Sequence, residues 1–251
     1  MTKQHGFLSH TIVQGPQETH NPRRVVVVLT LMALTCCNIA VWAQESEPKE
    51  KAEVSQLISV GVSGGLTLFF RSLNINQAPA ECAPCDRATV PAYDRWAIHD
   101  PIGVYSTMSD YLLLGLALGT WIDLAATEGS KAAFSSIETV GWTWAATELS
   151  KVLLGRKRPV LYTGRAPGEV DKTENLRSMP SGHTSIAFAL ATSYILNTRD
   201  RENKFPAILA GAAAVSIGVL RVAAGRHFPS DVVVGAAIGM GGAAVVYQIR
   251  F

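Results

Sequence analysis

The chain has 251 residues, 48% of them apolar, and a mean hydropathy of +0.19, higher than in a typical soluble enzyme and lower than in a protein fully embedded in lipid. The net charge of +2 arises in residues 1–43, which contain three basic residues (Lys3, Arg23 and Arg24) and one acidic residue (Glu18). Residues 44–251 contain the other 19 of the 22 basic and 19 of the 20 acidic side chains, so their net charge is zero. A neutral remainder gives no reason to expect a nucleic-acid partner.

Residues 1–43 are predicted to be a signal segment, within which residues 25–43 form an uncharged apolar run. Arg23 and Arg24 precede it and the small residue Ala43 ends it, which is the pattern of a cleavable secretory signal peptide. Its 19 residues are also long enough for a signal anchor that stays in the membrane uncleaved. Both interpretations predict export to the bacterial cell envelope, and they leave cleavage open.

Residues 44–104 are predicted to form an extension with one helix and many loops. Residues 57–70 are apolar but interrupted by glycine, and we expect a buried or interfacial helix there. In an exported protein, Cys82 and Cys85 favour a disulfide over a zinc site, because no second pair of ligands accompanies them. A thioredoxin-like redox role is the alternative, but the surrounding βαβ pattern is missing.

The remainder, residues 105–251, is predicted to be a helical domain. Strand-like alternation is largely absent, so the fold class is all-α: a helical bundle of about five to six core helices, membrane-embedded, with the active site at one end. The predicted helical segments of this domain are 106–127, 132–154, 182–197, 205–223 and 230–249.

The helices differ in how well they suit lipid. Glu138, Glu148 and Lys151 argue against full lipid exposure of the second of them. An uncleaved anchor running outward, followed by five alternating spans, would place both termini in the cytoplasm and one end of the bundle in the periplasm. The alternative is a soluble or peripheral periplasmic protein.

Three short clusters near the predicted helix ends supply the chemistry. They contain three cations, two imidazoles, one carboxylate and a Ser-Gly turn, which suits the binding of a tetrahedral oxyanion while a histidine attacks it. The candidate site residues are Lys151 and Arg158 in the first cluster, Ser181, Gly182 and His183 in the second, and Arg221, His227 and Asp231 in the third.

Helix geometry predicts that these clusters meet. Lys151 and Arg158 are seven residues apart, which places them on one helix face, and Pro159 is expected to stop that helix. Ser181 is expected to cap the next helix, and Gly182 to allow close approach of a ligand. Because successive helices alternate in direction, the three clusters should lie at the same end of the bundle. Taken singly, each of these residues has an ordinary structural explanation, such as a cap or a surface histidine.

The three clusters together resemble the type 2 phosphatidic acid phosphatase superfamily, which includes lipid phosphatases, soluble acid phosphatases and vanadium-dependent haloperoxidases. The resemblance covers about residues 105–248 and departs at Leu220, where the family usually has serine. It implies that His227 attacks phosphorus to form a phosphohistidine, that Asp231 hydrogen-bonds the imidazole, and that His183 serves as general acid and base. It also implies a phosphate-binding set of Lys151, Arg158, Ser181, Gly182 and Arg221.

The resemblance further implies a metal-independent phosphatase, with no cofactor, that hydrolyses a phosphate monoester or diphosphate of an envelope lipid. The expected partners are the membrane and a phosphorylated lipid or small phosphate ester, and the expected location is the inner membrane with the site facing the periplasm. A soluble exported acid phosphatase of broad range is the main alternative. A vanadium-dependent haloperoxidase and a non-catalytic envelope protein are less favoured, because the chain is short and every ionisable residue of the clusters is intact.

Overall fold

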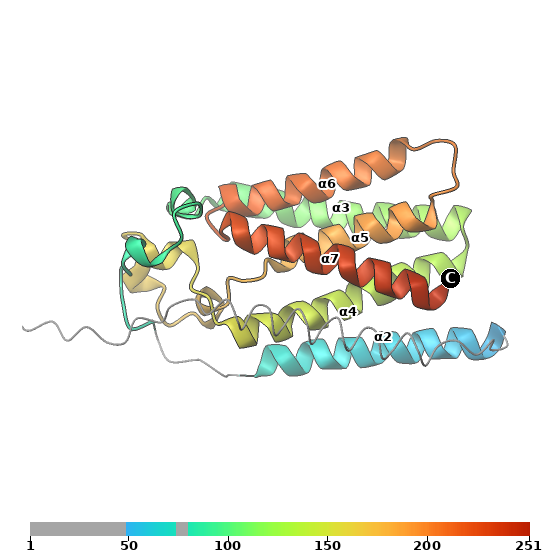
Figure 1. Ribbon diagram of the computed structural model, residues 1–251, viewed down its shortest axis with the longest axis horizontal. Helices are drawn as coiled ribbons and strands as arrows, with labels where there is room; N and C mark the ends of the chain where they lie inside the picture. The colour runs from blue at the N-terminus through green and yellow to red at the C-terminus, as the bar shows by residue number, and fades with distance from the viewer. Residues whose placement is uncertain (1–48, 74–79) are drawn as a thin grey trace, which may run out of the picture.

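In the described part of the chain, six α-helices form an elongated bundle (Figure 1). The computed structural model describes residues 49–73 and 80–251, and those ranges contain no strand. The predictions for residues 25–43 lie outside the described residues. The helices are α2 (Lys49–Ser72), α3 (Gly103–Thr127), α4 (Ser130–Leu154), α5 (Gly182–Asn197), α6 (Phe205–Ala223) and α7 (Pro229–Arg250).

Successive helices run in opposite directions along the bundle (Figure 1). The end of α4, the start of α5, the end of α6 and the start of α7 therefore lie at one end, together with the segments 80–102 and 155–181. These two segments are folded into short 3-10 turns such as Pro159–Tyr162 and Thr173–Leu176. The predicted all-α bundle is confirmed, and the clusters named from the sequence lie at its loop-covered end.

Helix α4 ends at the residue predicted for segment 132–154, but Arg158 does not lie on it as expected. The helix stops at Leu154, and Gly155 follows it in the left-handed region with φ of 55°, a conformation that glycine adopts at little cost. Arg158 therefore lies in the loop after α4, and Pro159 begins the next 3-10 turn instead of stopping the helix. Lys151 lies in the last turn of α4, so both cations are at the same end of the bundle, one on a helix and the other in a loop.

The core of the bundle lies around α5. Leu190 of α5, Leu124 of α3 and Ile217 of α6 are all fully buried in one apolar cluster. A second cluster fills the loop-covered end, where Leu161 and Phe228 are fully buried. These two clusters join the loops to the helices, and so hold the segments that carry the candidate residues against the bundle.

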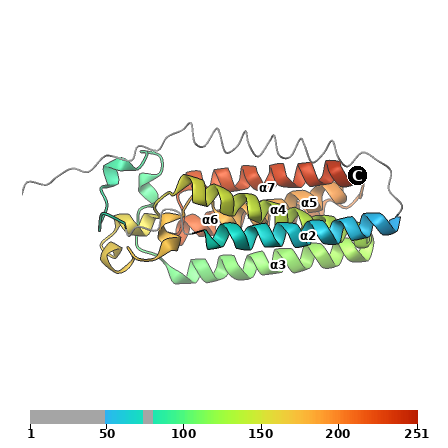
Figure 2. The ribbon, with the colours of Figure 1, turned by 90° about the horizontal axis from the view of Figure 1, so that it is seen from below.

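Helix α2 is longer than predicted and packs lengthwise on α4, as both views show (Figure 2). The Trp142 ring nitrogen donates a hydrogen bond to Ser59 at 2.9 Å, which ties the two helices together. Most of the apolar side chains of α2 remain exposed, among them Leu57 and Leu68. Helix α2 is therefore longer than the predicted segment 57–70, and most of its apolar surface is not buried.

Three of the described helical segments are long and apolar enough to cross a membrane: Val54–Ser72, Phe205–Ala223 and Pro229–Arg250. The first lies in α2, which the sequence-based topology did not count among the spans. The bundle consequently has six long helices between residue 49 and the C-terminus where the sequence predicted five spans.

Candidate active site

A cavity of about 730 Å³ opens at the loop-covered end of the bundle. Six of the eight candidate residues line it: Lys151, Arg158, Gly182, His183, Arg221 and His227. The other two, Ser181 and Asp231, are completely buried and lie outside the lining. Helix ends and one loop thus bring residues from all three clusters to a single hollow.

His227 lies between α6 and α7, and its ring is only 2% exposed. Its Nδ1 lies 2.8 Å from the backbone carbonyl oxygen of Ser178, which can only accept a hydrogen bond. Nδ1 is therefore the protonated ring nitrogen, and Nε2 carries the lone pair. This tautomer is the one that a nucleophilic histidine requires.

Burial lowers the pKa of His227 to about 3, because the charged imidazole would lose its hydration. The Asp231 carboxylate opposes this shift, and the nearby Arg158 charge adds to it. The ring is consequently neutral at pH 7 and keeps its lone pair free for attack on an electrophile.

Asp231 does not hydrogen-bond the ring as the resemblance implies. Its Oδ2 lies 3.7 Å from Nδ1 of His227, too far for a hydrogen bond. The same oxygen accepts hydrogen bonds from the Ser178 hydroxyl at 2.6 Å and from the Phe228 backbone N–H at 2.9 Å. The carboxylate instead acts on His227 through its charge and through Ser178, whose hydroxyl it holds and whose carbonyl orients the ring.

A buried guanidinium connects Asp231 to a second carboxylate that the sequence did not reveal. Arg156 donates through Nη1 to Asp231 and through Nη2 to Asp94 at 2.7 Å, and it lies 4.3 Å from the centre of the Phe228 ring. Asp94 also accepts the backbone N–H of Ser230 at 3.1 Å. This chain of alternating charges fixes the start of α7, and with it the backbone that carries His227.

Arg158 and Arg221 supply unsatisfied donors at the cavity. The Nε atoms of both are buried and have no hydrogen-bond partner among the described residues. Arg221 also donates from Nη1 to Ser109 at 3.0 Å and to Ser106 at 3.2 Å, which orients its guanidinium group. Buried donors without partners are rare in folded proteins, and two of them beside one cavity suit an anionic ligand.

The second imidazole, His183, stands in the first turn of α5 and is paired with a residue that sequence reasoning missed. Its Nε2 lies 2.8 Å from Oδ1 of Asp110 on α3. The same carboxylate oxygen lies 3.6 Å from Nη1 of Arg221. Asp110 therefore touches both a candidate proton donor and a candidate phosphate ligand.

The start of α5 faces Lys151 at short range. A Cβ atom at Gly182 would lie only 3.1 Å from the Lys151 ammonium nitrogen, so the missing side chain makes room for that cation. Lys151 is held by Glu148 at 2.7 Å. Contrary to expectation, the Ser181 side chain does not cap α5. Its hydroxyl oxygen accepts a hydrogen bond from the Thr184 hydroxyl at 2.9 Å, and its backbone N–H donates one to the carbonyl oxygen of Asp231 at 3.0 Å.

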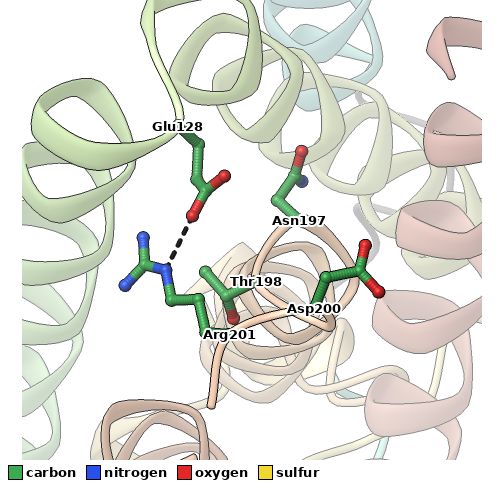
Figure 3. A pocket seen from close by; sticks show the side chains of 5 residues that line it. All are labelled: Glu128, Asn197, Thr198, Asp200 and Arg201. Atoms are coloured by element: carbon green, nitrogen blue, oxygen red, sulfur yellow. Dashed lines mark hydrogen bonds and ion pairs between the residues drawn. The ribbon is translucent and has the colours of Figure 1, made fainter. Parts of the chain in front are cut away.

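A second, smaller hollow of about 230 Å³ lies at the opposite end of the bundle (Figure 3). Arg201 reaches from the loop after α5 to Glu128 at the end of α3, with 2.7 Å between Nε and Oε1. A further 2.7 Å bond joins Arg201 to Asp123. Because its donors are engaged by carboxylates, this cation links helices and offers little to an external anion.

Among residues 49–73 and 80–251, no group of three or more His, Cys, Asp or Glu side chains is arranged to hold a metal ion. Cys82 and Cys85 are joined by a disulfide in the loop region that covers the cavity end. The Cys85 backbone N–H donates to the carbonyl of Leu161 at 2.8 Å, which fastens this small loop to the segment after α4.

Comparison with known proteins finds one matching family and one similar curated protein. Residues 132–251 match the family model of the PAP2 superfamily. A curated protein from Porphyromonas gingivalis, "Lipid A 1-phosphatase", is 42% identical over 64 residues, which make up 25% of this chain and 14% of that protein. The alignment thus spans a small part of the length of that relative. No solved structure matches the chain.

Proposed function

We propose that the chain is a phosphatase that hydrolyses a phosphate ester of an envelope lipid through a phosphohistidine, because residues 132–251 match the PAP2 superfamily. The observation that carries the proposal is a neutral, buried His227 beside two guanidinium groups whose Nε donors have no partner. The name of the Porphyromonas relative supports a phosphorylated lipid as the class of substrate.

The first step forms a bond from Nε2 of His227 to phosphorus and breaks the bond from phosphorus to the leaving oxygen. His183 gives its proton to that oxygen, so the product departs as an alcohol or a phosphate. In the second step His183 removes a proton from water, the water oxygen bonds to phosphorus, and the P–N bond breaks. Inorganic phosphate leaves, and both imidazoles return to their starting states.

The phosphoryl oxygens need cations that are already in place. Arg158 and Arg221 donate from their free N–H groups, and Lys151 with the Gly182 backbone N–H completes the set at the start of α5. Such a preorganised arrangement stabilises the charge that develops in the transition state more than the charge of the ground state. Because lysine and arginine side chains neutralise the phosphoryl charge in this mechanism, it requires no metal ion.

The surroundings of the cavity support a lipid as substrate over a small soluble ester. Leu113, Trp144 and Ile186 line the cavity beside the charged residues, which gives an apolar group a place next to the phosphate. Large apolar side chains are also exposed on the outer faces of the helices, such as Ile122 and Val233, as suits a bundle in a membrane. We place the protein in the inner membrane with the cavity facing the periplasm.

The test is phosphate release by purified protein from a panel of phosphorylated lipids and soluble phosphate esters. Wild-type activity should persist in EDTA and be blocked by vanadate, which mimics the transferring phosphoryl group. His227→Ala should lose activity by several orders of magnitude with an unchanged helical spectrum, because the attacking atom is missing. Arg165→Ala is the matched control, since Arg165 is exposed and lies outside the cavity lining.

Two results would contradict the proposal. Near-normal turnover by His227→Ala would remove the nucleophile from the mechanism. Activity that is lost in EDTA and restored by zinc or magnesium would replace the arginine and lysine set with a metal ion.

A further inference from the structure

The cavity is lined by more cations than the three clusters supply. Besides the cluster cations, three arginines belong to its wall: Arg71, Arg177 and Arg226. Six cations in all face three carboxylates, those of Asp110, Glu148 and Glu174. A single phosphate group carries about 1.5 to 2 negative charges near pH 7, so a substrate with one phosphate leaves part of this positive charge unmatched.

Arg226 is the first unmatched cation. It directly precedes His227, and the turn that carries both begins at Gly225, whose φ of 66° is the left-handed conformation. A Cβ atom at Gly225 would lie 3.1 Å from the backbone oxygen of His99, so both the angle and the space favour glycine. The half-buried Arg226 side chain has no hydrogen bond or ion pair with any described residue.

Arg226 lies near the cations of the reacting site. Burial lowers the pKa of the Arg158 guanidinium, and the charge of Arg226 lowers it further, while Glu174 opposes the change. The two arginines therefore repel each other, Glu174 and Glu169 offset part of this repulsion, and an anion that binds next to both arginines relieves it further. The position of Arg226 therefore suits an anion that extends beyond the reacting phosphate.

Arg71 is the second unmatched cation, and it comes from α2. Arg177 holds the end of that helix: its Nη1 donates to the carbonyl oxygen of Arg71 at 3.3 Å, and its Nη2 donates to that of Leu73. Arg177 is buried, with its guanidinium directed to the backbone, so it positions Arg71 at the cavity. The Arg71 side chain is exposed and has no ion pair with the described residues.

We propose that Arg71 and Arg226 form a second phosphate subsite beside the reacting one, so that the preferred substrate carries two phosphoryl groups. The inference rests on the proposed function and makes its substrate class narrower. The second group can be the next phosphate of a diphosphate ester or a separate phosphate on the same headgroup. Both sources present the same tetrahedral anion to the two guanidinium groups, which bind it by charge-assisted hydrogen bonds.

The test compares three lipid substrates with the same acyl chains: a monophosphate, a diphosphate ester and a bisphosphate with its two phosphates apart. Wild-type kcat/KM should be about tenfold or more higher for at least one of the doubly phosphorylated lipids than for the monophosphate, as expected for one added bond to a charged group. In Arg226→Gln and in Arg71→Gln this ratio should fall towards one. Arg165→Gln should keep the wild-type ratio.

A binding measurement gives a readout that does not depend on turnover. Inorganic diphosphate should raise the thermal midpoint of His227→Ala more than inorganic phosphate does, and the added Arg226→Gln substitution should remove the difference. Equal kcat/KM for all three lipids in the wild type, or an equal loss on all three in the arginine variants, would overturn the subsite. A wild type that releases no phosphate from any lipid would instead refute the proposed function.

Discussion

At the scale of single residues, the chemistry depends on how His227 is held. The Ser178 carbonyl decides which ring nitrogen carries the proton, and burial keeps the ring neutral. In the mechanism that we propose, Asp231 is close enough to stabilise the positive ring that forms with the P–N bond, although its oxygens are occupied by other donors. The ring is thus neutral before attack and supported by a carboxylate afterwards.

The lowered pKa of His227 predicts how stability changes with pH. An unfolded histidine has an ordinary pKa near 6.5, whereas the folded ring takes up a proton only near pH 3. Between these values the unfolded state binds the proton and the folded state does not, so stability falls as the pH is lowered. From pH 7 to pH 5 this one group should cost about 2 kcal/mol.

The measurement is the thermal midpoint of the wild type and of His227→Gln in the same detergent at pH 7 and pH 5. The wild-type midpoint should drop more over this interval, because the variant has no imidazole to protonate at that position. Parallel drops in the two proteins would show that the buried ring is not the source of acid sensitivity.

The residues named from sequence motifs and those found only in the structure differ in one respect. His183, His227 and Lys151 stand beside helix ends with recognisable glycine or proline signals, so spacing alone brings them together. The contact of Asp94 with Arg156 joins positions 62 residues apart, and its contact with Ser230 joins positions 136 apart. No periodic pattern connects such partners, and the segment around Asp94 has loop composition.

At the scale of elements, the contact between α5 and α7 sets the spacing between the two catalytic candidates. These helices make the most extensive contact in the described chain. A Cβ atom at Gly235 would lie 2.7 Å from the backbone oxygen of Ser181, and one at Gly239 would overlap the oxygen of Ser185. The backbones thus touch where His183 begins one helix and Asp231 begins the other.

This contact predicts opposite outcomes for two alanine substitutions in α7. Gly239→Ala should destabilise the protein by about 1–3 kcal/mol, since the added carbon pushes the helices apart. It should also lower activity, because α5 carries His183. Gly241→Ala should be neutral or stabilising by about 0.5–1 kcal/mol, because nothing lies within 4 Å of the new methyl group.

Thermal midpoints and phosphate release of the two variants, measured side by side, check this prediction. A Gly239→Ala protein as stable as Gly241→Ala would mean that the two helices can separate at no cost.

Helix positions followed from the sequence more readily than helix ends. The segments 182–197 and 205–223 were predicted with the bounds that the structure shows, because Ser-Gly, Phe-Pro and charged loops delimit them. The segment 132–154 also ends where α4 ends, but the expectation that Arg158 lies on this helix was wrong, because Gly155 turns the chain out of the helix before Arg158. Helix α2 was predicted too short because its first turns are polar and because the residues that it buries, Gln56, Ser63 and Thr67, are polar too, so no apolar stripe marks its contact with α4.

At the scale of the whole molecule, all three clusters and the disulfide lie at one end of the bundle. Lys131, Arg199, Arg201, Lys204 and Arg250 lie at or near the other end, but the loops of the cavity end carry more basic residues, so their count does not orient the bundle. A disulfide between Cys82 and Cys85 suits an oxidising compartment such as the periplasm. The cysteine chemistry therefore favours an orientation with the cavity end in the periplasm.

This orientation predicts the labelling of two introduced cysteines. Gly164→Cys, in the exposed loop after α4, should react with a membrane-impermeant thiol reagent in intact inner-membrane preparations that are right side out. Asn203→Cys, in the exposed loop between α5 and α6, should react only after the membrane is opened. The unsubstituted chain supplies the background from its own cysteines. Equal labelling of both sites before opening would point to a soluble exported protein.

Because α2 runs the full length of the bundle, it determines at which end the described chain begins. Six described helices that alternate in direction bring the chain back to the end from which it started: Lys49 and Arg250 lie at one end of the bundle, and His227 lies at the other. A signal that delivered residue 44 to the periplasm would place Lys49 there too and leave the catalytic groups inside the cell. The disulfide at the cavity end favours the opposite orientation, with the cavity end in the periplasm and Lys49 on the cytoplasmic face. A protease site placed just before Lys49 should thus be cut from the same side as Asn203, whichever face that proves to be.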